Sequence, residues 1–294
     1  GTENSDLPAY IVLASGRNIQ PLLDSYWGAG FLPPEYQGVQ LRTQGEPVLY
    51  LKNPEGVSRE TRRNQISLLG SLNRRRHELV KDPAILARIK QYELAFRMQV
   101  AVPELANIAS EPEQIRETYG ADLGKVSFAN NCLLARRLSE SGVRFIQLYE
   151  KGWDSHGDIY TQHSDRCRAV DRPIAALISD LKQRGLLEET LVIWGGEFGR
   201  TPMAQGSGTS FGRDHHPHGF TVWMAGGGIR PGIVHGATDE FGYFAEQDKV
   251  HVHDLNATIL HCLGMNHEKF TYRHQGRDFR LTDVHGQVIH NLLV

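Results

Sequence analysis

The sequence predicts an α/β protein in which a mainly parallel sheet lies between helices and follows a helical, loop-rich N-terminal portion. Two features carry this prediction. Short apolar runs rich in β-branched and aromatic residues occur at 143–149, 190–196 and 219–227, and a stretch with helical periodicity, 161–185, separates the first two. Strand, helix and strand in that order are the pattern of a βαβ unit, whose two strands are parallel.

The N-terminal portion is expected to combine one strand with loops and helices. Residues 8–14 (PAYIVLA) form a short apolar run that predicts a strand, whereas 20–56 contain many glycines and prolines and predict extended loops. Ser58 is a good N-cap for a helix that runs to about residue 80. The Asp-Pro pair at 82–83 is a typical start for a second helix, which we expect to end near residue 100.

The C-terminal portion is expected to begin with a helix from about Gly124 to Gly142 and to contain two later helices, 253–264 and 283–293. We therefore predict a single domain, 1–294. Its first part, 1–123, is the loop and helical portion, and its second part, 124–294, is the α/β core.

Composition excludes several classes of protein. The 294 residues suffice for one large domain, and 32 basic against 34 acidic residues give a net charge of −2, so nucleic acid is not an expected partner. Three scattered cysteines are too few for a disulfide framework. No apolar run reaches the roughly 18 residues of a membrane span. The opening GTENSDLP lacks a methionine and a signal sequence, and we expect the chain to be a trimmed piece of a longer protein.

Histidines and carboxylates gather in the loops beside the apolar runs of the second half. Of the 14 histidines, only His77 precedes residue 150. Ligands of open α/β sheets bind at the carboxyl ends of strands, and a mixed set of imidazoles and carboxylates suits Zn²⁺ or Mn²⁺ better than Ca²⁺. The polar residues of these loops are Asp154, His156, Glu197, Arg200, Asp214, His215, His216 and His218. The pattern therefore predicts a divalent metal site.

Simpler interpretations stand beside this one. The Asp-x-His pair at 154–156 occurs often by chance, and Glu197 is open to a second role as a buried carboxylate paired with Arg200 or Arg213. We interpret Asp254 as a helix cap and His253 as a surface or second-shell residue. The arginines between residues 59 and 76 are interpreted as a solvated helix face.

Six separated motifs stand out along the second half of the chain: WDSHGD, VIWGGEFGRTP, GRDHHPHGF, AGGGIRPG, HVHDLNATILHCLG and QGRDFRLTDVHG. In this order they resemble a bacterial family of domains of unknown function. The stretches GAGFLPPEYQGVQ and PVLYLKNPEGV are also similar to its members, so the resemblance covers nearly the whole chain. That family is sulfatase-like in architecture, belongs to the alkaline-phosphatase superfamily and is generally exported by twin-arginine signals, which implies a periplasmic or extracellular protein.

The resemblance implies a set of site residues. Asp154 and His156 match the segment that supplies an Asp and a His to one metal, and Glu197 stands where superfamily enzymes carry an Asp-His pair. A further ligand is expected in GRDHHPH, with His215 favoured over His216 and with Asp214 in support. His218 and His253 would lie in the second shell, and Arg200 would stabilise anionic charge as a catalytic residue. The first strand and the nucleophile of the superfamily would lie upstream of this chain.

Three functional hypotheses follow from these observations. The first is a metal-dependent hydrolase of phosphate or sulfate esters, which would act on a small molecule or a polysaccharide. The second is a secreted, non-catalytic binding or assembly protein that keeps a degenerate metal site. The third is a mutase or isomerase of the same superfamily, which would move a phosphoryl group without releasing phosphate.

Overall fold

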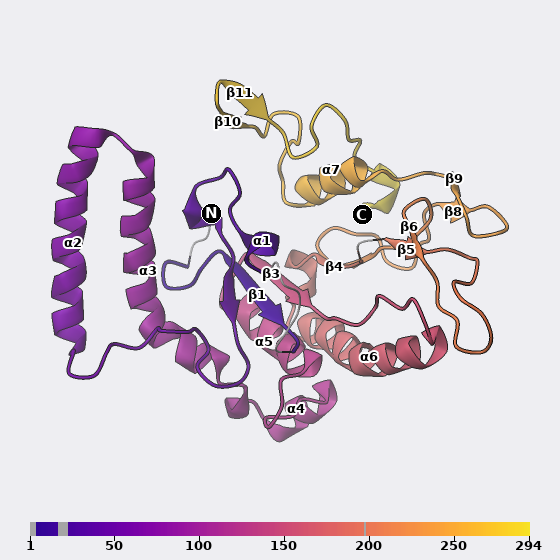
Figure 1. The fold of residues 1–294 in the computed structure, drawn as a ribbon, viewed down its shortest axis with the longest axis horizontal. Helices are drawn as coiled ribbons and strands as arrows, with labels where there is room; N and C mark the ends of the chain where they lie inside the picture. Colours follow the sequence, from indigo (N-terminus) through magenta and orange to yellow (C-terminus); the bar gives the residue numbers. More distant parts are fainter. Residues whose placement is uncertain (1–3, 17–22, 197) are drawn as a thin grey trace. The chain divides into compact units, whose positions relative to one another are not determined.

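The computed structural model describes residues 4–16, 23–196 and 198–294. These residues form a mixed α/β structure with seven α-helices and a small parallel sheet (Figure 1). The predicted α/β class is confirmed. The chain divides into two compact units: the first contains Gly1–Lys151 and Arg168–Leu177, and the second contains Gly152–Cys167 and Ile178–Val294. The alkaline-phosphatase-like architecture and the single domain stay predictions.

The first unit contains a three-stranded parallel sheet in the order β2-β1-β3 (Figure 1). Its central strand β1 (Tyr10–Ala14) pairs with β2 (Val39–Leu41) on one side and β3 (Phe145–Tyr149) on the other. Ile11, Val12 and Leu13 are fully buried, as expected for a parallel strand that is covered on both faces. The strands expected at 8–14 and 143–149 are therefore confirmed.

Helix α5 (Phe128–Glu140) packs against this sheet and is the most deeply buried helix of the first unit. The side chain of Ser127 caps its first turn by accepting a hydrogen bond from the backbone N–H of Asn130. Arg136, which is 2% exposed, is neutralised by Glu111 and Glu140, each 2.5 Å away. The buried charge is tolerated because both carboxylates compensate it.

The remaining helices of the first unit are α1 (Leu23–Trp27), α2 (Arg59–Val80), α3 (Pro83–Ala106) and α4 (Glu113–Tyr119). The predicted N-caps Ser58 and Asp82 are confirmed: each side chain accepts a hydrogen bond from a backbone N–H of the helix that follows. Helix α3 continues six residues beyond the expected end near residue 100 and passes through Pro103.

The prediction that 20–56 form only loops is wrong, because this region also contains α1, a 3₁₀ turn (Pro34–Tyr36) and strand β2. Among the glycines of this region, Gly38 serves close packing rather than a loop. A Cβ atom at Gly38 would lie 2.8 Å from Cε1 of Tyr10 and 3.0 Å from Cγ2 of Val12. The missing side chain therefore lets β2 approach β1.

In the residues of the second unit that the structure describes, the strands form four two-stranded antiparallel pairs and no parallel sheet. The predicted order of strand, helix and strand is observed as β3, α6 (Ile159–Gln183) and β4 (Val192–Trp194). Among the described residues, however, β4 pairs antiparallel with β7 (Trp223–Ala225) and not with β3, so the parallel arrangement of 143–149 and 190–196 stays a prediction. Between β4 and β7 the described residues form the short pair β5 (Gly199–Arg200) and β6 (His215–His216).

Two helices complete the described fold, α6 (Ile159–Gln183) and α7 (Val252–Cys262), and both confirm expected helices. Two antiparallel pairs flank α7 in sequence. They are β8 (Ala237–Thr238) with β9 (Ala245–Gln247) and β10 (Tyr272–His274) with β11 (Arg277–Phe279).

The helix predicted at 283–293 is wrong, because only the 3₁₀ turn His290–Leu292 forms there. Asp283 and Gly286 have φ values of 49° and 94°, which a right-handed helix does not allow. Gly286 also packs closely: a Cβ atom there would lie 2.8 Å from the carbonyl oxygen of His253. The turn around Gly286 thus interrupts the apolar periodicity that suggested a helix.

Candidate metal site

The loop that carries Asp154 and His156 is held by a second loop of the same unit. The backbone N–H of Arg213 donates to the carbonyl of Ser155 at 3.1 Å, and the N–H of Ile159 donates to the carbonyl of Phe211 at 3.1 Å. Gly212 lies between these contacts, and a Cβ atom on it would lie 2.0 Å from the carbonyl carbon of His156. Only glycine therefore lets the two backbones meet, and this meeting fixes the place of His156.

The short pair β5–β6 brings Arg200 opposite His215. The backbone N–H of Thr201 donates to the carbonyl of Asp214 at 2.9 Å, which extends the pairing by one step. Successive residues of a strand point to opposite sides. His215 therefore faces the loop of Asp154, while His216 faces the other way.

Asp154, His156 and His215 form a group that we call the donor cluster. Oδ1 of Asp154 lies 2.8 Å from Nε2 of His156 and 3.1 Å from Nε2 of His215, and the two imidazole nitrogens are 3.2 Å apart. Atoms placed this closely need a proton or a cation between them, because their lone pairs otherwise repel. Among the residues that the structure describes, no other group of three His, Cys, Asp or Glu side chains has this convergence.

The donor cluster fits a divalent transition metal ion. Zinc binds imidazole nitrogen and carboxylate oxygen at about 2.0–2.2 Å, and a tetrahedral site then separates its ligand atoms by roughly 3.3–3.6 Å. The spacings of 2.8 to 3.2 Å in the donor cluster are only slightly shorter. Two nitrogen donors and one carboxylate suit Zn²⁺ or Mn²⁺ better than Ca²⁺, which prefers oxygen.

Arg200 holds the carboxylate of the donor cluster in place. Its Nη2 donates to Oδ1 of Asp154 at 2.9 Å and to the carbonyl of Trp153 at 3.2 Å. Its Nη1 donates to the carbonyl of Arg213 at 3.3 Å. The Arg200 hydrogen bond is the main cause that lowers the pKa of Asp154 below its ordinary value, with His156 and His215 adding to the effect. Asp154 is therefore held as the anion that a metal ligand must be.

Gln205 orients the first imidazole of the cluster, a role that sequence reasoning missed. Its Oε1 lies 2.7 Å from Nδ1 of His156. When Nδ1 carries the proton and donates to this oxygen, Nε2 keeps a lone pair that faces Asp154 and His215. The isolated bridge between Gln205 and Gly212 places this side chain. No motif in the sequence marks Gln205, because its position depends on that pairing.

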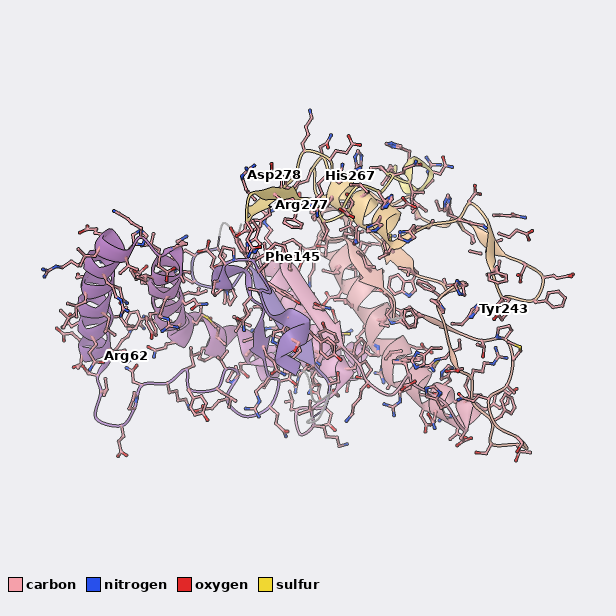
Figure 2. The ribbon with its side chains drawn as sticks, turned by 45° about the horizontal axis from the view of Figure 1, so that its top comes forward. Arg62, Phe145, Tyr243, His267, Arg277 and Asp278 are labelled. Atoms are coloured by element: carbon pink, nitrogen blue, oxygen red, sulfur yellow. The ribbon has the colours of Figure 1, made fainter. Side chains whose placement is uncertain are left out.

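The structure places two of the predicted metal-site residues, Asp214 and His216, outside the donor cluster. Oδ1 of Asp214 lies 3.9 Å from Nδ1 of His156 and accepts the backbone N–H of His215 at 2.8 Å, so Asp214 supports the neighbouring loop. His216 is 3% exposed, and its Nε2 bonds the carbonyl of Tyr243, a residue labelled in Figure 2. Glu197 lies outside the described residues.

The two predicted second-shell histidines contact aromatic rings of other residues. His218 packs against the ring of Phe244, with centroids 5.7 Å apart. His253 lies on α7 and stacks on His285 at 5.5 Å. The roles of these residues as ligands or as second-shell groups stay predictions.

The comparison with protein families identifies the relatives of the chain. A family model described as "Protein of unknown function (DUF1501)" matches residues 1–293. The chain belongs to the DUF1501 family. Neither curated proteins nor solved structures give a match to it. The family description names no activity, so the relation of this DUF1501 chain to the alkaline-phosphatase superfamily stays a prediction.

In the part of the chain that the structure describes, no helix combines the length and the apolarity that a membrane span requires.

Proposed function

We propose that this DUF1501 chain binds one divalent transition metal ion through Asp154, His156 and His215 and hydrolyses phosphate or sulfate esters at that site. The observation that carries the proposal is the convergence of Oδ1 of Asp154 and the two Nε2 atoms within one small volume. An ion of this kind, when bound, would supply Lewis acidity toward an ester oxygen and would favour the ionised form of a water molecule, so that water serves as the nucleophile and no nucleophilic side chain of this chain is required. Zn²⁺ and Mn²⁺ are the expected metals.

The exposure of the donor cluster suits a catalytic site better than a closed structural one. The Asp154 side chain is 62% exposed, and the side chains of His156 and His215 are 40% and 35% exposed. Structural zinc sites are usually enclosed by four protein ligands, whereas catalytic sites keep an open position. Three converging donors that face solvent leave room for an ester group beside them.

Arg200 acts in this proposal as a positioning residue. Its guanidinium is bonded to the carboxylate of Asp154 and to the carbonyls of Trp153 and Arg213, and its side chain is 14% exposed. The guanidinium thereby connects the loop of Trp153 and Asp154 to the segment of Arg213. The positive charge also lies beside the carboxylate of the cluster, where it favours an anionic substrate.

A non-catalytic metal-binding protein is the second candidate, and one observation favours it. The oxygen of Asp154 that faces both histidines is also the oxygen that accepts from Arg200. A carboxylate shared in this way has less charge to offer a metal ion, which suits a site that only stabilises a fold or an assembly.

An ester panel separates the two candidates. The full chain is loaded with Zn²⁺ or Mn²⁺ and assayed against 4-nitrophenyl phosphate, bis(4-nitrophenyl) phosphate and 4-nitrophenyl sulfate. We expect hydrolysis of at least one ester, lost in His156→Ala and His215→Ala but retained in His253→Ala. Metal binding without turnover of any ester would establish the non-catalytic candidate, and turnover that survives both ligand substitutions would contradict the proposed site.

A further inference from the structure

Helix α2 places its leucines on the side that faces away from the rest of the first unit. The residues of α2 that are buried or half-buried follow one face, and most of them are polar. They are Arg62, Ile66, Gly70, Asn73 and His77. α3 is the main element that packs against α2, and Figure 1 shows the two helices side by side. An amphipathic helix normally buries its apolar side, and α2 does the reverse.

The exposed side carries Leu68, Leu72 and Leu79, which we call the leucine stripe. Their exposed fractions are 63%, 53% and 86%. At about 100° per residue these three positions lie within roughly 40° of one another around the helix axis. Three large apolar side chains in line are more than the scattered exposure that a soluble surface normally shows.

The spacing of the leucine stripe fits a helix as its occupant. Residues 68, 72, 75 and 79 follow the alternation of four and three residues that forms a coiled-coil seam, with Arg75 at the one polar position. Leu69, which is 43% exposed, lies at one edge of this seam, and an apolar side of this width accommodates the side chains of one facing helix. A helix that lies in a membrane surface presents a wider apolar face, commonly with aromatic residues.

Charge defines the chemistry of the partner. Between Arg59 and Ala106 the sequence has ten lysines and arginines and five acidic residues, a net charge of +5 in a chain whose total is −2. Two of these arginines lie at the stripe itself, Arg75 in the seam and Arg76 beside it, while Glu78 lies on the opposite flank. Arg75 and Arg76 favour acidic residues on the facing helix.

The same charges disfavour a second copy of this chain as the occupant. Antiparallel self-pairing centred on the leucine stripe would bring the run Arg74–Arg76 of each copy beside the equivalent run of the other. Opposed like charges at this spacing are destabilising. We propose that the leucine stripe is the docking site for an acidic amphipathic helix of a partner protein.

Two synthetic peptides of about four heptads test this proposal on the full chain. Both carry leucine at the seam positions, but one has glutamate and the other lysine at the flanking positions. Binding is measured by fluorescence anisotropy at low and high salt. We expect the glutamate peptide to bind, to bind more weakly at high salt, and to be preferred over the lysine peptide.

Variants assign the binding to the leucine stripe. The double substitution Leu68→Gln/Leu72→Gln should weaken binding of the glutamate peptide about tenfold, because two apolar contacts are lost. Leu123→Gln, at a leucine that is 44% exposed elsewhere in the first unit, is the matched control and should leave binding unchanged. Arg75→Glu/Arg76→Glu should reverse the preference toward the lysine peptide. Circular dichroism verifies that each variant is folded.

Other outcomes would overturn the proposal. These are failure to bind the glutamate peptide, equal binding of both peptides, and binding that the leucine substitutions do not weaken. Binding only to vesicles of phosphatidylserine and phosphatidylcholine would assign the stripe to a membrane surface. Concentration-dependent dimers that Leu68→Gln/Leu72→Gln abolishes would assign it to a second copy of the chain.

Discussion

Two groups of histidines lie in the second unit, and they differ in what their nitrogen atoms face. In the donor cluster, His156 and His215 direct their Nε2 atoms toward one carboxylate oxygen. In the second group, which we call the cap cluster (His251, His253 and His285), the rings stack, with centroids 4.8 and 5.5 Å apart. Both groups are rich in imidazole, but only the first brings ligand atoms together.

The difference arises from how the backbone uses each group. In the cap cluster, Nδ1 of His251 accepts the N–H of His253 at 3.3 Å, and Oδ2 of Asp254 accepts the N–H of His251 at 2.9 Å. These bonds form a capping box at the start of α7, which confirms the expected capping role of Asp254. In the donor cluster the corresponding atoms face one another. Convergence of ligand atoms therefore indicates a metal site more sharply than histidine content does.

The largest expected effect is on Zn²⁺ affinity, when one histidine is removed from the donor cluster or from the cap cluster. We expect His156→Ala to weaken Zn²⁺ binding at least about a hundredfold, because a first-shell ligand is lost, while His253→Ala changes it by less than about twofold. Isothermal titration calorimetry of the full chain measures both. Equal losses in the two variants would show that the clusters are not functionally distinct.

The contact at Gly212 tests whether loop packing creates the donor cluster. Gly212→Ala places a Cβ atom 2.0 Å from the backbone of His156. We expect a loss of about 2–4 kcal/mol in the free energy of unfolding, together with weaker Zn²⁺ binding. Gly157→Ala is the matched control, because the nearest atom to its Cβ would lie 3.7 Å away. Urea denaturation measures both, and similar stability of the two variants would contradict the close packing.

The orienting role of Gln205 predicts a smaller effect. Gln205→Ala removes the oxygen that lies 2.7 Å from Nδ1 of His156. Loss of an outer-shell partner typically weakens metal binding 10- to 100-fold, and we expect a value near tenfold, because His156 remains as a ligand. Gln205→Glu should retain binding, since its carboxylate also accepts from Nδ1. A Gln205→Ala variant with unchanged Zn²⁺ affinity would be inconsistent with this role.

The ion pair of Arg200 and Asp154 predicts the smallest effect, a change in pH dependence. The pKa of Asp154 is lower in the folded than in the unfolded chain, so the ionised carboxylate stabilises the folded state. This stabilisation is fully present above the ordinary Asp pKa of about 3.9 and is lost as the pH falls through the lowered pKa. Arg200→Gln should raise the pKa of Asp154 and move that loss to higher pH. Carbon NMR titration of the Asp154 carboxyl group in the metal-free chain measures the shift. An Asp154 pKa that does not respond would contradict the pairing.

Local signals in the sequence predicted local structure well. Ser58 and Asp82 start helices because a side-chain oxygen needs only the next few N–H groups to act as a cap. The donor pair Asp154 and His156 was found in the same way, since two residues in one short loop stay close together.

Features that depend on distant pairing were not predicted. The antiparallel partnership of β4 with β7 follows from how the chain returns between them, which apolar runs do not specify. The pattern of residues alone gives no choice between His215 and His216; the family resemblance favoured His215, and the choice depends on the side to which each residue of β6 points. The two histidines are adjacent in sequence, but successive residues of a strand point to opposite sides, so His215 faces Asp154 and His216 faces Tyr243.

X-ray absorption spectroscopy of the zinc-loaded chain tests the donor cluster most directly, because it reports which atoms surround the ion. The account predicts one bound Zn²⁺ with two imidazole nitrogens and a carboxylate oxygen at about 2.0–2.2 Å, and a spectrum that loses one imidazole in His215→Ala. A zinc ion bound by sulfur, a shell without imidazole, or no uptake of zinc by the folded chain would contradict it.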